Sequence, residues 1–91
     1  MNAPNQALSR DYVYRRVAQL LHEIVGTPLE DINEDITVDE DLQMTSVIFV
    51  ELHVAIEEEL DTELDPIEVV ELNRLGDIVD YMYERALETR R

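Results

Sequence analysis

Cysteine is absent from this 91-residue chain, and its absence excludes several kinds of site. Without a thiol the chain has no disulfide framework, no thiolate nucleophile and no cysteine-ligated zinc or iron–sulfur centre. Glycine occurs only twice, and no long window alternates apolar and polar residues as a half-buried strand does. The sequence therefore favours a helical protein whose chemistry does not depend on a cysteine of its own.

Basic residues are also scarce, since seven arginines stand against 22 acidic residues for a formal net charge of −15. Such a field repels phosphate backbones and anionic lipid heads and steers the molecule toward basic protein surfaces. No segment approaches the roughly 18 to 20 apolar residues that span a bilayer, and the N-terminal stretch lacks the pattern of a secretory signal. We expect a soluble, cytoplasmic monomer with protein partners, and neither nucleic acid nor membrane as a ligand.

The first segment with helical periodicity covers about residues 9–25. Ser9 is a suitable N-cap, Gly26 follows at the position of a left-handed C-terminal cap, and Pro28 prevents continuation. The residues expected on its buried face are Val13, Val17, Leu20, Leu21 and Ile24.

A long acidic connection, residues 26–45, follows this helix. A connection of this length in a small domain is usually functional or held down by apolar side chains. We expect it to pack over the helices through four apolar residues: Leu29, Ile32, Ile36 and Leu42.

The second helix is predicted over residues 46–60, with Thr45 as its cap. It carries two apolar stripes, of which one suffices to bury a helix in a small bundle. The stripe expected to face the core is Phe49, Leu52, Ile56 and Leu60. The second stripe is Val47, Val50 and Val54, rimmed by Glu51, Glu57, Glu58 and Glu59, and its exposure requires an explanation.

A short third helix is predicted to begin at Asp65 and Pro66 and to end by Leu72, and Asn73 is predicted to cap a last helix over about residues 74–88. The inward-facing residues of the last helix are expected to be Leu75, Ile78, Val79, Met82 and Leu87. The fold class is therefore all-α: a small antiparallel four-helix bundle with a long loop between its first two helices. We expect one domain over residues 1–91, with flexible ends at 1–8 and 89–91.

Calcium binding is one candidate function of the acidic connection. It places four oxygen-bearing residues at positions 1, 3, 5 and 9 of an EF-hand-like loop: Asp31, Asn33, Asp35 and Asp39. The glycine that makes the sharp turn is replaced by Ile36, and the bidentate glutamate by Leu42. A calcium sensor is therefore disfavoured, and we expect no specific metal site.

Neither histidine has the companions of a catalytic or metal site. His22 precedes Glu23 and His53 lies one turn before Glu57, which is typical of side-chain pairs on a helix surface. Ser46 lacks the G-x-S-x-G elbow of a nucleophilic serine. Two interpretations of Ser46 remain open: an ordinary residue of a first helical turn, or a hydroxyl that another enzyme modifies.

Residues 41–82 resemble the acyl carrier proteins and related phosphopantetheine carriers. The resemblance follows their second, third and fourth helices without a gap, through DLQMTSVIFVELHVAI, EEEL, DTEL and LGDIVDYM. It implies that Ser46 receives 4′-phosphopantetheine from coenzyme A through a separate Mg²⁺-dependent transferase. The thiol of that group would carry acyl intermediates of polyketide, fatty-acid or related biosynthesis, and the chain would have no catalytic activity of its own.

The same resemblance assigns a docking surface on the second helix. It implies that phosphopantetheinyl transferase and the acyl-loading and condensing enzymes bind Val47, Val50, Glu51, Val54, Glu57 and Glu58 through basic patches.

The attachment stretch departs from the family in two respects. Members usually have Asp-Ser-Leu there, often with a glycine shortly before, whereas this chain has Thr45, Ser46 and Val47. Phe49 and His53 also replace residues that are typically smaller or apolar. These departures favour a discrete carrier of a specialised pathway, such as polyketide assembly. The alternative is an acidic helical adaptor on the same fold that carries no prosthetic group.

Overall fold

The computed structural model describes residues 8–89, which form an all-helical fold. Its elements in chain order are α1 (Arg10–Ile24), the 3₁₀ turn η1 (Leu29–Asp31), α2 (Ser46–Leu60), α3 (Pro66–Val70) and α4 (Leu75–Thr89). The predicted class and the four predicted helices are confirmed, each boundary within about two residues of its predicted place. The expectation of flexible ends falls, apart from Leu8 and Thr89, outside the described residues.

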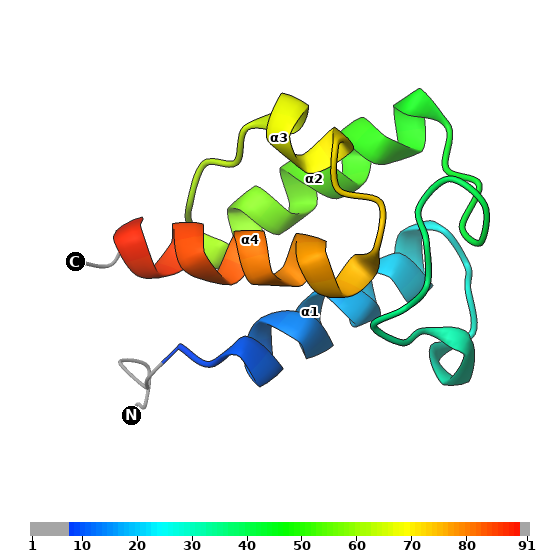
Figure 1. Cartoon of the computed structure of the whole chain (residues 1–91), viewed down its shortest axis with the longest axis horizontal. Helices are drawn as coiled ribbons and strands as arrows, with labels where there is room; N and C mark the ends of the chain where they lie inside the picture. The colour runs from blue at the N-terminus through cyan, green and yellow to red at the C-terminus, as the bar shows by residue number, and fades with distance from the viewer. Residues whose placement is uncertain (1–7, 90–91) are drawn as a thin grey trace.

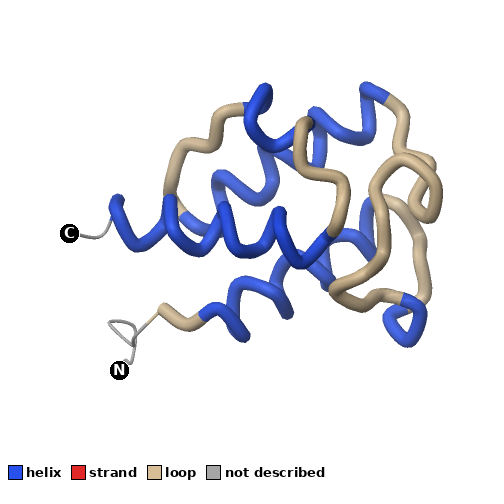
Figure 2. The backbone as a smooth tube through the Cα atoms, in the orientation of Figure 1, coloured by secondary structure: helices blue, strands red, loops and turns tan. Residues whose placement is uncertain are grey.

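The three long helices form the bundle, and α1 packs against both α2 and α4. Figure 1 shows that α2 and α4 both run antiparallel to α1. The short α3, which lies between α2 and α4 in the sequence, lies over one side of the bundle. The long connection between α1 and α2 closes one end of the bundle, as the tan segment on the right of Figure 2 shows. The helices of the described residues are too short or too polar to cross a bilayer.

The core is built from the apolar stripes that the sequence predicts. Its largest fully buried side chains are Val13, Val17, Leu21, Ile56, Leu60 and Val79. Five predicted positions differ: Leu29 is 47% exposed, Leu20, Ile24 and Phe49 are only half-buried, and Ala86 takes the inward place that was predicted for Leu87. Ile32, Ile36 and Leu42 are buried as predicted, so three of the four proposed apolar residues hold the long connection against the bundle.

Both ends of α1 are stabilised as predicted. The Ser9 hydroxyl accepts a hydrogen bond from the Tyr12 backbone N–H at 3.0 Å. At the other end Gly26 adopts a φ of +94°, which glycine reaches without steric cost, and its N–H donates to the carbonyls of Leu21 and His22.

The start of α4 is stabilised differently from the prediction. The first N–H groups of the helix donate to the long connection, Leu75 N to Ile36 O and Gly76 N to Glu34 O, each at 2.9 Å. Asn73 therefore does not cap α4. Its side-chain oxygen instead accepts hydrogen bonds from the backbone N–H groups of Val38 and Asp39, at 3.1 and 3.0 Å.

Arg10 holds three parts of the fold together. Its guanidinium donates to both carboxylate oxygens of Glu34 in the long connection, at 2.6 and 2.8 Å, and to Gly76 O at 3.0 Å. It also pairs with Asp80 of α4. A Cβ at position 76 would lie 2.6 Å from the Arg74 guanidinium and 2.8 Å from the Glu34 carboxylate, so a larger residue there would make these side chains shift. Arg10 thus fixes the long connection against α1 and α4.

We expect Arg10→Met to lower the melting temperature by several degrees, because it leaves two carboxylates and a carbonyl without their shared donor. Arg15→Met is the matched control, since Arg15 makes only an exposed pair with Asp11 on the same helix. Thermal unfolding followed by circular dichroism measures both changes. Equal melting temperatures of the two variants would contradict this role for Arg10.

The Arg10 variant should also change the response to acid. Hydrogen bonding from Arg10 lowers the pKa of Glu34 from its ordinary value of 4.5. A carboxylate whose pKa is depressed by folding contributes stability above its unfolded pKa, and that contribution is lost as pH falls through the folded pKa. The stability difference between the native chain and Arg10→Met is therefore expected to be largest near neutral pH and to shrink below about pH 4.5.

Candidate functional site

Ser46 is the first residue of α2, and its side chain is exposed. Thr45 caps the helix as predicted, with its hydroxyl accepting from Ile48 N at 3.2 Å. The first turn of α2 contains no acidic residue, although the chain is strongly acidic overall. The Ser46 hydroxyl therefore stands at the positive end of a helix dipole, where a negatively charged phosphate group is favoured.

The backbone just before Ser46 is unusual. Gln43 adopts a φ of +50°, in the left-handed region that glycine adopts most easily. The resembled family often has a glycine in this stretch. The positive φ of Gln43 is less favourable than that of a glycine would be. It is nevertheless needed for the turn that leads the chain from the buried Leu42 into α2.

Neither histidine bonds to the Ser46 hydroxyl in the described structure. Nδ1 of His22 lies 2.9 Å from the carbonyl oxygen of Thr27, and Nε2 of His53 lies 3.1 Å from that of Leu64. Among residues 8–89 no side chain is found within hydrogen-bonding distance of the Ser46 hydroxyl. The geometry suits a hydroxyl that another protein must activate.

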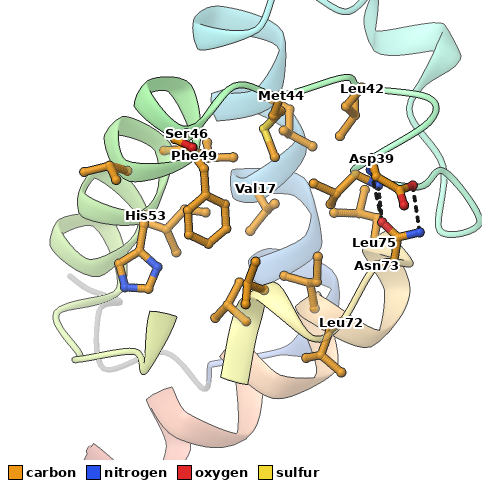
Figure 3. Close-up of a pocket in the computed structure, with 18 of the residues that line it drawn as sticks. Val17, Asp39, Leu42, Met44, Ser46, Phe49, His53, Leu72, Asn73 and Leu75 are labelled. Atoms are coloured by element: carbon orange, nitrogen blue, oxygen red, sulfur yellow. Dashed lines mark hydrogen bonds between the residues drawn. The ribbon is translucent and has the colours of Figure 1, made fainter. Parts of the chain in front are cut away.

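A pocket of about 430 Å³ opens beside Ser46. Its walls come from every helix and from the long connection, and Figure 3 shows Ser46 and Phe49 on one side with Leu42, Leu72 and Leu75 on the other. Most of the lining side chains are apolar. This cavity could not be predicted from the sequence, because its volume depends on how the elements pack.

The second stripe of α2 is exposed, as predicted. Val47, Val50 and Val54 expose 75%, 58% and 46% of their surface. Two further apolar side chains that the sequence analysis did not assign to this surface, Ile67 and Val70 of α3, expose 68% and 64%. Val50 and Val70 both line the pocket, so the exposed apolar residues of α2 and α3 meet at its opening.

The acidic residues around this stripe differ in their surroundings. Glu51 and Glu58 are exposed, and no arginine of the described residues pairs with them. Glu57 is half-buried, and one of its oxygens accepts from Leu64 N at 2.9 Å. Glu59 pairs with Arg16 of α1 at 2.7 Å and therefore belongs to the packed side of α2.

Residues 15–82 match the family model described as the phosphopantetheine attachment site. The acyl carrier protein of Acidothermus cellulolyticus is 33% identical over 76 residues, which are 84% of this chain and 90% of the relative. The chain belongs to the acyl carrier protein family. The acyl carrier protein of Saccharopolyspora erythraea is 30% identical over 73 residues, 80% of this chain and 77% of the relative. The adaptor alternative is not favoured, because the matched model describes attachment of the prosthetic group.

As a member of this family the carrier uses covalently attached 4′-phosphopantetheine, and the residues around Ser46 suit that group. An exposed hydroxyl, a first helical turn free of carboxylates and an apolar pocket beside them fit a phosphodiester that ends in a long arm. When bound, the group supplies a terminal thiol, which this cysteine-free chain lacks.

His53 is not the surface residue that its spacing from Glu57 predicts. Its side chain is only 10% exposed, and Nε2 contacts both Leu64 O at 3.1 Å and Glu57 Oε2 at 3.3 Å. His53 and Glu57 thereby hold the segment after α2 through the two backbone groups of Leu64. His22 is exposed, as predicted.

The acidic side chains that suggested an EF-hand loop make other contacts. Asn33 accepts from Asp35 N at 2.9 Å, Asp35 pairs with Arg74 at 3.1 Å, and Asp39 accepts from Asn73 at 2.9 Å. Within residues 8–89 no three His, Asp or Glu side chains gather as metal ligands. These contacts serve the packing of the long connection.

We expect Thr45→Ala to cost about 1 kcal/mol in the free energy of unfolding, because the first turn of α2 loses its side-chain acceptor. Thr27→Ala is the matched control, since the Thr27 hydroxyl makes no hydrogen bond within the described residues. Chemical denaturation measures both variants. A Thr45→Ala protein as stable as the native chain would show that the cap contributes nothing.

Proposed function

We propose that Ser46 is the residue to which 4′-phosphopantetheine is attached. The observation that carries the proposal is that the chain has two serines, Ser9 and Ser46, and that only Ser46 falls in the matched segment 15–82. Ser9 is engaged as the cap of α1, whereas the Ser46 hydroxyl is exposed.

The reaction at Ser46 is carried out by a phosphopantetheinyl transferase. The Ser46 oxygen bonds to the phosphorus that carries the pantetheine arm, the phosphoanhydride bond of coenzyme A breaks, and adenosine bisphosphate leaves. The serine proton passes to a base of the transferase, which agrees with the lack of a base beside Ser46. The carrier itself is a substrate and catalyses no step.

The loaded carrier passes acyl thioesters between enzymes of polyketide, fatty-acid or related biosynthesis. Thr45, Val47, Phe49 and His53, which depart from the common family pattern, favour a discrete carrier of a specialised pathway. We further propose that it acts as a single domain and a monomer in the cytoplasm, because its net charge of −15 opposes self-association.

Incubation with coenzyme A and a broad-specificity transferase is expected to add one phosphopantetheine group, about 340 Da by intact-mass spectrometry. Ser46→Ala should abolish the addition, because the acceptor oxygen is lost. Ser9→Ala should retain it, because Ser9 caps α1 and lies outside the matched segment. Modification of the Ser46→Ala protein, or none of the native chain with several transferases, would overturn the assignment.

We also propose that partner enzymes bind the exposed stripe Val47, Val50 and Val54. Basic side chains of the partner would pair with the carboxylates of Glu51, Glu57 and Glu58. The exposed valines supply a small apolar contact, and the unpaired charges of Glu51 and Glu58 attract a basic groove. Such an interface associates fast through electrostatic steering and releases easily, as a shuttle requires. Glu57 contributes less charge to this surface, because its carboxylate also bonds to Leu64 N.

Glu51→Arg is expected to lower kcat/KM of the transferase for this carrier about tenfold, mainly through slower association. The loss should shrink as salt screens the charges. Glu84→Arg makes the same charge change at an exposed position of α4 and serves as the control. Steady-state kinetics at low and high salt would contradict the proposed surface if both variants lost activity equally.

A further inference from the structure

The pocket beside Ser46 is lined in part by His53, whose Nδ1 is buried and has no hydrogen-bond partner among the described residues. The side chain comes from α2 and is nine-tenths buried. Figure 3 shows its imidazole beside the ring of Phe49 on the α2 side of the pocket, and the two ring centroids lie 5.9 Å apart. A polar atom in this position needs a partner, and the surrounding chain does not supply one.

The contacts of the other ring nitrogen determine what kind of partner Nδ1 accepts. Nε2 faces two groups that only accept hydrogen bonds, the carbonyl of Leu64 and the carboxylate of Glu57, so it carries the proton. In the neutral imidazole Nδ1 is then an acceptor. The missing partner must therefore be a donor, such as a hydroxyl group.

Apart from Ser46, the proposed attachment residue, the other polar side chains of the pocket are already engaged. Asp39 and Asn73 bond to each other, and Asn73 also accepts from the backbone of the long connection. Thr45 accepts from Ile48 N. Among the polar side chains that line the pocket, His53 therefore holds a buried acceptor, Nδ1, that has no partner within residues 8–89.

His53 also lies where a chain attached near Ser46 could reach it. The two residues are seven positions apart in one helix, so they lie on nearly the same face, about 10 Å apart along the axis. Phe49 lies between them and lines the same pocket. Because Nδ1 is covered by its neighbours, contact with it requires a shift of nearby side chains, and the half-buried Phe49 ring is the one beside it.

We propose that this pocket selects acyl chains that carry a hydroxyl group, whose O–H donates a hydrogen bond to Nδ1 of His53. The inference rests on the proposed attachment at Ser46. A saturated chain would fill the apolar pocket and leave Nδ1 without a partner, and a keto group, which only accepts, would do the same. The cargo favoured by this carrier is therefore a hydroxyacyl thioester.

The test loads the ¹⁵N-labelled carrier from coenzyme A thioesters with four chains of one length: octanoyl, β-oxooctanoyl, β-hydroxyoctanoyl and ω-hydroxyoctanoyl. Intact mass first confirms loading. At least one hydroxylated chain is expected to shift the Nδ1 resonance of His53 to lower frequency than octanoyl or β-oxooctanoyl does, as acceptance of a hydrogen bond requires. The resonances of His22 on α1 should be the same in all four forms.

Variants separate the hydrogen bond from the structural role of His53. We expect the hydroxylated form with the shifted resonance to melt at a higher temperature than the octanoyl form. His53→Gln keeps a donor for Leu64 O but removes Nδ1, and should abolish this difference in melting temperature. His22→Gln should preserve it.

Equal Nδ1 shifts for all four chains would overturn the proposal, as would a melting difference that persists in His53→Gln. A water molecule on Nδ1, or a chain that stays outside the pocket, would give equal shifts. Failure of every chain to load, seen by mass, would overturn the attachment at Ser46 and this inference together. Full loading without a change in the Nδ1 resonance of His53 would overturn this inference and leave the attachment at Ser46 standing.

Discussion

The arrangement of the helices and the position of Ser46 depend on hydrogen bonds between the long connection and the start of α4. Ile36 O and Glu34 O accept from the first N–H groups of α4, and Val38 N donates back to Asn73 O. These bonds satisfy helix-end groups that would otherwise need a cap and also fix the connection that leads to Ser46. Arg10 adds charged hydrogen bonds to the same junction. One set of contacts thus stabilises α4, closes one end of the bundle and positions Ser46, the proposed attachment residue.

The distribution of charge distinguishes the packed side of the molecule from the side that carries the exposed valines of α2, which we propose as the docking surface. Each arginine of the described residues pairs with a carboxylate, and these pairs involve α1, α4, the long connection and the packed side of α2. Among residues 8–89 no arginine pairs with Glu51 or Glu58 beside the exposed valines of α2, although Arg85 lies near Val54 and Glu58. In a chain of net charge −15, these two exposed carboxylates are therefore left for the basic partner that we propose, while Arg10 and Arg16 bond across the packed elements.

Much of the fold could be predicted from the sequence, and Ser46 could be singled out as the candidate attachment residue, because both depend on local signals. Ser9, Gly26, Thr45 and Pro66 mark helix ends through the chemistry of single residues. The predictions for Asn73 and His53 failed because groups distant in the sequence compete for the same hydrogen bonds or cover the same side chains. Asn73 has the side chain of a helix cap, but backbone carbonyls of the connection already occupy that role, so it bonds to Val38 and Asp39 instead. Likewise His53 and Glu57 have the spacing of a surface pair, yet the segment after α2 covers them.

The sequence alone determined the helices, the acidic and apolar character of α2 and the family to which Ser46 points, since periodicity, capping and motifs are written in neighbouring residues. Only the tertiary structure decided that a pocket lies beside Ser46, that Val70 of α3 lines it together with Val50, and that one nitrogen of His53 is buried without a partner among residues 8–89. These features arise from the distances between elements far apart in the chain. Small shifts in packing change a cavity or bury an atom without changing any local pattern.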